Sequence, residues 1–555
     1  MTHLVTDVLI IGAGGAGMYA AISAARHGAE RVLLVDKSLV GRGGATIMAQ
    51  MTVAAALAEV SDDDPSLHLA DTLTAGRGLC DETLASILCE EAPARIREMG
   101  EWQVGWARRD SGRIAQVAAP GHSRPRCCYV DFLNTGPAVA ATLRRQVSRI
   151  DAVRRVSNLT ITDLVTHDSA VVGAVALDTA SGAPVTIAAS ATIIAAGGLT
   201  RIYRRNSASA NMGGDGYALA LMAGAPLVDM EFVQFFPIGH LAPRLVGMDP
   251  IMWDPFRYKL GGRLLDGAGH EFLARYGSDE TDAYTTPRDI ATYAITKEVA
   301  AGRGSPHGGA YLSFEHLPPA ELRAAFGPVI DRLARNGIDL ATAPVEVAPI
   351  AHYHMGGIVV DERMASPVPG LYAAGEVVGG ANGANRLSGN AIPEALVFGE
   401  CAGRFAAVAE PVADWRDSHA AEAVECIRRL AEGHRGEIAA AVLLDELRAL
   451  MWDDVGPLRD DAGLVRALAR LGEMRVALPD LAIEPGPESN ATLAGWFELR
   501  ASLIAAEAVT RAALTRCESR GAHQREDFPR TEPAFALAQR VVRGADGGIV
   551  ASLER

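Results

Sequence analysis

The sequence lacks several features that would place it in a common class of protein. None of its 555 residues belongs to a run approaching the roughly 20 consecutive apolar residues that a membrane-spanning helix needs. The apolar segment from Val8 to Ile11 is too short and too early for a signal peptide. Seven cysteines are scattered without CxxC spacing, which favours reduced thiols. We therefore expect a cytoplasmic protein with no transmembrane segment.

Positive charge is also scarce. The chain has 52 basic against 67 acidic residues, and the net charge of -15 would repel a phosphate backbone, so we expect no nucleic-acid partner. The adjacent Cys127 and Cys128 are the only cysteine cluster, and we interpret them as small buried residues without chemistry. We predict no metal site. The length argues for two to four packed units.

A strand, glycine turn, helix and strand can be recognised at the start of the chain. Val8 to Ile11 is an apolar run typical of a parallel strand covered on both faces, and small residues from Ala20 to Ala25 suit a helix packed closely on a sheet. Arg31 to Val35 forms the second strand, which ends at Asp36. Together they predict one βαβ unit.

Two later apolar strands also end in glycine, at Gly197 and Gly375. Strand ends so far apart in sequence predict one doubly wound domain assembled from residues 1–240 and 346–410. The polar, proline-bearing residues 241–345 would then be an insertion, and helical spacing of Ala, Leu, Arg and Glu predicts a helical C-terminal region within residues 411–555. The predicted fold class is α/β, with a Rossmann-like doubly wound domain.

The glycine turn has the pattern of a dinucleotide site. Gly12, Gly14 and Gly17 fit G-x-G-x-x-G, in which the glycines allow a tight turn, a close approach to a pyrophosphate and close helix packing. The N-terminus of the following helix attracts phosphates. Asp36 lies 24 residues after Gly12, where a carboxylate can accept both ribose hydroxyls. These residues predict a dinucleotide but leave FAD and NAD open.

Six ordered motifs over some 500 residues resemble the flavoprotein subunits of succinate dehydrogenase and fumarate reductase, and L-aspartate oxidase. They are DKS with GGAT at 36–38 and 43–46, AGG with GGDG at 196–198 and 213–216, DMEFVQF at 229–235, HYHMGGI at 352–358, GE with GANRL at 375–376 and 383–387, and ESRGAH at 518–523. The resemblance implies that the insertion is an α+β capping domain and that the cofactor is FAD.

The resemblance also implies which residues contact FAD. A histidine that bonds covalently to flavin in the membrane-bound complexes is replaced here by Ala45, so we expect FAD to be non-covalent. The expected cofactor-binding residues are Gly12, Gly14, Gly15, Gly17, Asp36, Lys37, Gly43, Gly44, Ala45, Thr46, Gly198, Asp215, Glu376 and Asn390.

Three residues match the family's catalytic set. His352 and Arg386 correspond to residues that bind a substrate carboxylate, and Arg288 corresponds to the arginine that moves the proton. Guanidinium groups bind carboxylates bidentately, which suits a small carboxylate substrate. The implied reaction is hydride transfer between a substrate carbon and flavin N5.

The substrate pocket departs from the family. Phe236 stands where the family has a substrate-binding histidine, Ile238 replaces a threonine, and the family's Thr-Glu pair falls on Asp254 and Pro255. We therefore expect Gln50, Phe236 and Asp254 to line a pocket for a monocarboxylate, or for a substrate whose second end is larger and less polar than a carboxylate. Asp254 or His240 could replace a missing polar contact.

Several alternatives remain open from sequence. The chain could be an amino acid oxidase like L-aspartate oxidase, with oxygen reoxidising the flavin. It could instead be a subunit that depends on an iron-sulfur or other electron-transfer partner. A flavin-binding scaffold without activity is disfavoured because Arg288, His352 and Arg386 are all retained.

Overall fold

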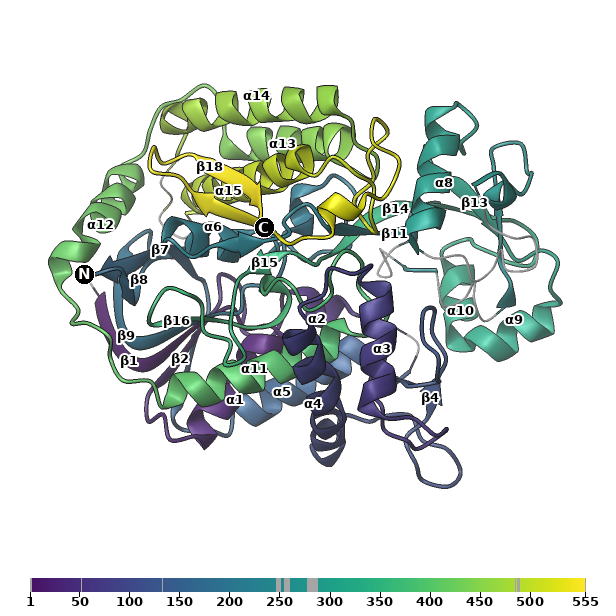
Figure 1. The fold of residues 1–555 in the computed structure, drawn as a ribbon, viewed down its shortest axis with the longest axis horizontal. Helices are drawn as coiled ribbons and strands as arrows, with labels where there is room; N and C mark the ends of the chain where they lie inside the picture. Colours follow the sequence, from purple (N-terminus) through teal and green to yellow (C-terminus); the bar gives the residue numbers. More distant parts are fainter. Residues whose placement is uncertain are drawn as a thin grey trace.

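A seven-stranded sheet forms the centre of the larger part of the molecule (Figure 1). The computed structural model describes residues 2–50, 52–131, 133–245, 251–253, 260–276, 288–484, 486 and 490–554, without the side chains of 288 and 289. The strands are β1 (Thr2–Ile11), β2 (Val32–Val35), β6 (Val153–Val156), β7 (Leu159–His167), β8 (Ala170–Asp178), β9 (Pro184–Ile194) and β16 (Leu371–Ala373).

The sheet is parallel where the chain forms its βαβ unit. Its order is β6-β2-β1-β9-β8-β7, with β16 also paired to β9. β1 runs parallel to β2 and β9, so Ile10 lies beside Leu34 and Ile193, whereas β7, β8 and β9 form an antiparallel meander. The glycine-ended strands predicted from sequence are therefore neighbours, although nearly 180 residues separate β9 from β16 along the chain.

A layer of closely packed helices lies on one side of this sheet (Figure 1). A Cβ at Gly399 of α11 would lie 2.6 Å from Ala16 O of α1, and a Cβ at Gly403 would lie 2.4 Å from Ala20 O, so small residues let these two helices pack closely. The helices of this layer are α1 (Gly15–Arg26), α2 (Ala45–Met48), α3 (Pro65–Ala75), α4 (Glu82–Glu101), α5 (Thr135–Val147) and α11 (Ala391–Ala407).

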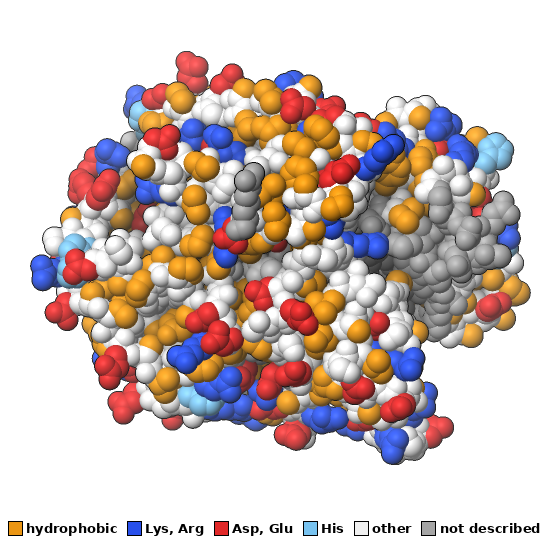
Figure 2. Space-filling view, in the orientation of Figure 1, with side chains coloured by type: hydrophobic (Ala, Val, Ile, Leu, Met, Phe, Trp, Pro, Cys, Tyr) orange, Lys and Arg blue, Asp and Glu red, His pale blue; other side chains and the backbone are white. Residues whose placement is uncertain are grey.

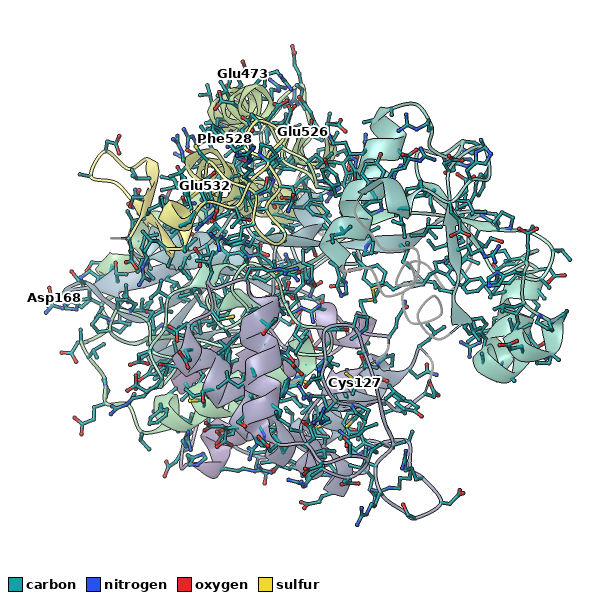
Figure 3. The ribbon with its side chains drawn as sticks, turned by 45° about the vertical axis from the view of Figure 1, so that its right-hand side comes forward. Cys127, Asp168, Glu473, Glu526, Phe528 and Glu532 are labelled. Atoms are coloured by element: carbon teal, nitrogen blue, oxygen red, sulfur yellow. The ribbon has the colours of Figure 1, made fainter. Side chains whose placement is uncertain are left out.

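A short three-stranded sheet lies beside this layer. Cys127 and Cys128 form β5, between β3 (Val53–Ala54) and β4 (Gln116–Val117), and both are fully buried. Figure 3 shows Cys127 within the body of the molecule, whereas Asp168 and Glu473 lie at its edge. The interpretation of this pair as buried packing residues is confirmed.

A separate four-stranded sheet carries the inserted unit, which is drawn in teal at the right of Figure 1. Its order is β11-β14-β13-β12, and its own hydrophobic core includes Phe236, Trp253 and Ile350. Its elements are β11 (Val233–Ala242), β12 (Arg263–Leu265), α8 (Arg288–Ala300), β13 (Ala310–Ser313), α9 (Pro319–Phe326), α10 (Pro328–Arg335) and β14 (Val345–His354). The boundaries expected near 240 and 345 fall within the paired strands β11 and β14, and they stay a prediction.

The C-terminal region is helical, but it ends in strands. Helices α12 (Asp417–Ala431), α13 (Ala440–Asp454), α14 (Asp461–Ala477) and α15 (Ala491–Thr515) are followed by a hairpin of β17 (Gln539–Arg543) and β18 (Ile549–Leu553). β17 pairs with β10 (Leu227–Val228), which also pairs with β15 (Gly357–Ile358). The predicted helical C-terminal region is confirmed. The hairpin was not predicted, because it depends on β10, more than 300 residues earlier in the chain.

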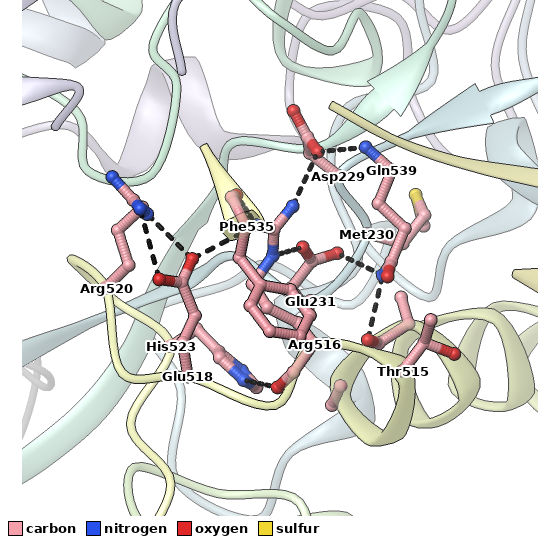
Figure 4. A network of polar contacts seen from close by, with 12 residues as sticks. Asp229, Met230, Glu231, Thr515, Arg516, Glu518, Arg520, His523, Phe535 and Gln539 are labelled. Atoms are coloured by element: carbon pink, nitrogen blue, oxygen red, sulfur yellow. Dashed lines mark hydrogen bonds and ion pairs between the residues drawn. The ribbon is translucent and has the colours of Figure 1, made fainter. Parts of the chain in front are cut away.

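A buried ionic cluster joins this region to the large domain (Figure 4). Arg516 is fully buried and pairs with Glu231, with Asp229 at 3.4 Å and with Glu518 at 3.2 Å. Arg520 pairs with Glu518 at 2.7 Å. We call these five residues the C-terminal cluster. Through this cluster the 518–523 motif attaches the C-terminal helices to the large domain.

Charged side chains of both signs are spread over the face in Figure 2, and hydrophobic side chains are interspersed among them. Within the part of the chain that the structure describes, no helix is long and apolar enough to cross a membrane. The same residues contain no group of three or more His, Cys, Asp or Glu side chains arranged to hold a metal ion.

Candidate functional site

One cavity of about 680 Å³ extends from the glycine turn to His352 and Arg386. Such a volume falls in the range of small-molecule and cofactor sites, about 300–1,000 Å³. Its wall includes backbone from the turn after β1, the ends of β2 and β9, the N-terminus of α11, and strands β11 and β14. The predicted residues that line it are Gly12, Gly14, Gly15, Asp36, Lys37, Gly44, Ala45, Thr46, Gln50, Asp215, Phe236, His352, Glu376 and Arg386.

The three motif glycines are needed for different reasons. Gly12 has φ +101°, and a Cβ there would lie 2.4 Å from Ala195 O. A Cβ at Gly17 would lie 1.8 Å from Gly12 O, so this glycine permits close contact between helix and turn. Gly14 has an ordinary φ of -74°, and its Cβ would meet no protein atom within 4 Å. Since Gly14 lines the cavity, the space beside it suits a bound group in contact with the backbone.

The end of β2 presents a polar cluster to the same cavity. Asp36 accepts hydrogen bonds from the N–H groups of Ala13 at 2.9 Å and Ser38 at 2.8 Å, and from the Asn211 amide at 2.9 Å. These bonds fix the Asp36 carboxylate at the cavity wall, where it is only 7% exposed. The Ser38 hydroxyl also donates to it at 2.9 Å, so the expected ribose contact has to share this carboxylate with four protein donors.

Lys37 and Asp215 form an ion pair of 2.7 Å across the cavity wall. Burial acts to lower the pKa of Lys37, but the neighbouring carboxylates of Asp215 and Glu498 outweigh it and the pKa is raised. Lys37 is therefore a cation at neutral pH. Together with the N-terminus of α1, it makes this end of the cavity suitable for an anionic group.

The short helix α2 carries the GGAT segment. Gly44 has φ +82°, and Gly15 N–H donates to Thr46 Oγ1 at 3.1 Å, which joins this segment to the glycine turn. Ala45 lines the cavity and supplies no nucleophile. Gly43 does not line the cavity; a Cβ there would lie 2.6 Å from Asn211 Nδ2, so its role is close packing.

Glu376 is a buried carboxyl in the cavity wall. Burial raises its pKa to about 8, against the hydrogen bond from His354 N–H at 3.1 Å and the charge of Arg386. At neutral pH the carboxyl is therefore largely protonated and can donate a hydrogen bond. Gly198 does not line the cavity; a Cβ there would lie 2.1 Å from Glu376 Oε1, so Gly198 makes room for this carboxyl.

Asn390 is at the N-cap position of α11, and its side chain is fully buried and bonded to Thr72 at 3.1 Å and to His68 at 2.9 Å. These two partners on α3 hold the amide away from the cavity, which Asn390 does not line. Its role as a cofactor-binding residue stays a prediction. The neighbouring residues Ala391 and Ile392 line the cavity instead.

The other end of the cavity brings together His352, Arg386 and Phe236. His352 Nδ1 lies 2.9 Å from the hydroxyl of Ser207, and its ring centroid is 5.5 Å from that of Phe236. Arg386 is 4% exposed, and its Nη2 donates to Gln234 Oε1 at 3.1 Å. A buried cation beside a fixed imidazole is an arrangement that can bind a carboxylate.

Gln50 and Met252 close this end from two different domains. Met252, from the inserted unit, donates its N–H to Gln50 Oε1 at 3.1 Å, and both residues line the cavity. Arg288 is the first residue of α8, but its side chain lies outside the described residues, as do Asp254 and Pro255 entirely.

Two residues considered for the pocket point elsewhere. Ile238 is fully buried in the core of the inserted unit and does not line the cavity. His240 does not line it either; its Nε2 lies 2.5 Å from Pro243 O and its Nδ1 accepts from Trp253 at 3.2 Å. The suggestion that His240 replaces a missing polar contact is therefore wrong. His354 is fully buried, with its ring nitrogens bonded to the Tyr217 hydroxyl and to Met230 O, so it has a packing role.

Sequence reasoning missed three residues at the substrate end. Ser207 bonds to His352, Gln234 bonds to Arg386, and Tyr353 has the Arg386 guanidinium 4.3 Å from the centroid of its ring. Gln234 and Tyr353 lie inside motifs that were recognised, so their position between named residues was the available signal. Ser207 lies between two motifs and gave none.

Comparisons with known proteins agree with this geometry. An FAD binding domain family matches residues 7–392, and a fumarate reductase flavoprotein C-terminal family matches residues 444–546. The fumarate reductase (CoM/CoB) of Methanothermobacter marburgensis has a subunit that is 38% identical over 531 residues, covering 95% of each chain. L-aspartate oxidase of Caulobacter vibrioides is 33% identical over 544 residues, covering 98% of this chain and 97% of its own.

Solved structures show the same fold over the whole chain. A variant of E. coli quinol fumarate reductase FrdA matches with a TM-score of 0.92 and 29% identity, covering 100% of this chain and 97% of its own. A Mycobacterium smegmatis Sdh1 complex in the apo form matches with a TM-score of 0.88 and 33% identity, covering 100% and 94%. The chain therefore belongs to the family of FAD-dependent oxidoreductases that includes the flavoproteins of fumarate reductase and succinate dehydrogenase and L-aspartate oxidase.

Proposed function

We propose that this enzyme oxidises or reduces a small carboxylate whose second end is not a carboxylate. The observation that carries the proposal is the single cavity, which joins the cofactor-binding turn to His352, Arg386 and Phe236. Its glycine turn, Lys37 and Asp36 fit a dinucleotide, and its other end fits a carboxylate beside an apolar group. When bound, FAD supplies hydride transfer at its flavin ring.

The residues of the chain would bind, orient and enclose the substrate. Arg386 and His352 would hold its carboxylate, with Ser207 fixing the imidazole. Met252 and Gln50 would close the site from two domains and exclude water, which strengthens the interaction of Arg386 with a carboxylate. We propose Arg288 as the proton carrier because it matches the family's proton-moving arginine. It is the first residue of α8.

The apolar side of the cavity supports a changed specificity. Phe236 and Met252 line it where a dicarboxylate would need a second set of donors. Losing a charge-assisted hydrogen bond to a buried carboxylate costs about 1.5–3 kcal/mol, or about 10- to 100-fold in affinity. Asp254 stays a predicted pocket residue outside the described part of the chain.

We expect succinate and fumarate to be poor substrates for this reason. The holoenzyme would be mixed anaerobically with a panel of mono- and dicarboxylic acids, and bleaching of the flavin absorbance would be followed; the reduced enzyme would be tested with unsaturated acids. Monocarboxylates with an apolar second end should react fastest. Turnover of succinate or fumarate at the usual rates of dedicated enzymes, roughly 1–1,000 per second, would contradict the proposed pocket.

We also propose that FAD is bound without a covalent link. Ala45 lines the cavity at the position where the family's covalent histidine would lie, and it has no atom that can bond to flavin. Acid or heat precipitation of the purified protein should release all of its FAD into the supernatant. Flavin fluorescence that stays with the washed, denatured protein would contradict this.

The electron acceptor can be tested on the same preparation. One relative is named as part of a larger enzyme and another as an oxidase, so both a partner protein and oxygen are candidates. Steady turnover with oxygen alone would favour an L-aspartate-oxidase-like reaction, whereas activity only with an artificial acceptor would favour an iron-sulfur or other electron-transfer partner. We propose a cytoplasmic location because none of the seven cysteines, all of which the structure describes, forms a disulfide.

A further inference from the structure

A buried carboxyl lies behind the arginine at the substrate end of the cavity. Glu394, on α11, is fully buried, and its Oε2 accepts two hydrogen bonds. One comes from the Tyr353 hydroxyl at 2.6 Å, and the other comes from the Asn382 amide at 2.8 Å. Glu394 Oε1 forms no hydrogen bond with the part of the chain that the structure describes. The carboxyl is therefore held through a single oxygen, the one that accepts from Tyr353.

Tyr353 connects this carboxyl to Arg386. It lines the cavity, is 3% exposed, and has the guanidinium carbon of Arg386 at 4.3 Å from the centroid of its ring. A cation over an aromatic face is strongly held when both groups are removed from water. Since the hydroxyl at the far end of the ring is bonded to Glu394, the ring cannot tilt without breaking that bond.

The guanidinium nitrogens of Arg386 also make hydrogen bonds along the edge of the group. Arg386 Nη2 donates to Gln234 Oε1 at 3.1 Å, and Gln234 Nε2 donates in turn to Asn385 Oδ1 at 2.9 Å and to Arg386 O at 3.0 Å. These bonds, together with the one from Arg386 Nη1 to Leu387 O at 3.4 Å, fix the position of the guanidinium edge. The Tyr353 ring packs against the face of the guanidinium and contributes to the orientation of its plane, and bidentate binding of a carboxylate requires both to be fixed.

A purely structural role for Glu394 would be to stabilise the packing of α11. Its two hydrogen bonds argue for more than this, because neither partner belongs to its own helix. One partner is the tyrosine that faces Arg386, and the other, Asn382, lies four residues before Arg386 in the chain. Burial raises the pKa of Glu394 to about 7, against the hydrogen bonds from Tyr353 and Asn382 and the charge of Arg386. Arg386 and the Glu394 carboxyl therefore interact electrostatically.

We propose that Glu394 and Tyr353 are positioning residues that orient the Arg386 guanidinium for the substrate carboxylate. The inference rests on the proposed function, in which Arg386 binds that carboxylate. It predicts that Tyr353→Phe, which keeps the ring and removes only the hydroxyl, weakens carboxylate binding. Glu394→Leu, which removes the acceptor, should have the same effect, and the two changes together should weaken binding no more than either alone.

The test is a titration of the FAD-loaded protein with propionate and with malonate, followed by the change in flavin absorbance. Tyr353→Phe and Glu394→Leu should each raise Kd about three- to tenfold, the range expected for one hydrogen bond. Tyr203→Phe is the matched control, because Tyr203 is also fully buried, its hydroxyl bonds to Val455 O at 3.4 Å, and it does not line the cavity. Its Kd should equal that of the wild type.

A second comparison separates positioning from general loosening. In an Arg386→Lys background, which keeps the charge but loses the planar fork, Tyr353→Phe should no longer change Kd. An equal weakening in both backgrounds, or no weakening in the wild-type background, would overturn the inference. If Arg386→Lys itself leaves Kd unchanged, the proposed function fails instead. Should Glu394→Leu not fold, Tyr353→Phe alone decides the matter.

Discussion

Gly14→Val should yield a folded protein that has lost most of its FAD. A valine at this position meets no protein atom, since a Cβ on Gly14 has nothing within 4 Å and the backbone φ of -74° suits any residue. The side chain would instead fill the space that we assign to the pyrophosphate. Overpacking of this kind costs about 1–3 kcal/mol or more, so the affinity for FAD should fall about 10- to 100-fold or further.

The measurement is the ratio of flavin to protein after purification, together with a titration of the apoprotein with FAD. Gly472→Val is the matched control, because a Cβ on Gly472 would likewise have no atom within 4 Å and its backbone is helical, but it lies on α14 outside the cavity. That variant should keep its FAD. Stoichiometric FAD in Gly14→Val would show that the pyrophosphate does not lie at this turn.

Arg516→Leu should be the most destabilising single change in the C-terminal region. It removes a fully buried cation from Asp229, Glu231 and Glu518, and it leaves the carbonyls of Phe535 and Leu537 without their donors at 2.6 and 3.0 Å. Breaking a buried ion pair by deleting one partner costs about 3–5 kcal/mol. We expect a large fall in the temperature of unfolding, measured at a fixed heating rate.

The stability that Arg516→Leu loses relative to the wild type should increase at high pH. In the C-terminal cluster three carboxyls face two guanidinium groups, and burial, aided by Glu231, raises the pKa of Asp229 to about 8 against the charge of Arg516. Because the folded state holds this proton more tightly than the unfolded state, its stabilising effect is complete below pH about 4 and is lost as pH rises through 8. Without Arg516 the pKa of Asp229 rises further, so the variant should go on losing stability above about pH 8, where the loss in the wild type levels off.

A surface arginine gives the control for this experiment. Arg470 pairs with Glu446 and Glu473 on exposed helices, and such pairs contribute about 0–1 kcal/mol. Arg470→Leu should barely change the unfolding temperature at any pH. An Arg516→Leu protein as stable as Arg470→Leu would mean that the C-terminal cluster does not hold the two regions together.

Local patterns predicted the core of this fold well. The βαβ unit was visible because strand, turn and helix each leave a signal within a few residues, and Asp36 lies where that signal ends. The β17–β18 hairpin was not visible, because its pairing with β10 is set by tertiary contacts and not by its own short sequence. Long-range pairs such as Ser207 with His352 were missed for the same reason.

Two residues that are close in sequence can also lie in different surroundings, which the sequence alone did not reveal. Phe236 and Ile238 are two residues apart on β11, but a register shift follows Phe236 and the strand continues into the inserted unit. Both residues belong to the core of that unit, but Phe236 also lines the cavity, whereas Ile238, at about 3.3 Å per residue, lies beyond the cavity wall. Nothing in the sequence indicated that the Asn390 amide, at the N-terminus of α11, is turned towards α3.

The central sheet also determines when the enzyme can begin to hold its cofactor during synthesis. β1 emerges before its neighbour β9, which ends at Ile194, whereas β16, which pairs with β9, ends at Ala373, and α11 closes the cavity only after that. At about 5–20 residues per second, a ribosome needs about 20–70 s to pass from β1 to Ala373. Until then the end of β9 that pairs with β16 has an unpaired edge, so the nascent chain should depend on chaperones, and fragments ending before residue 390 should aggregate and not bind FAD.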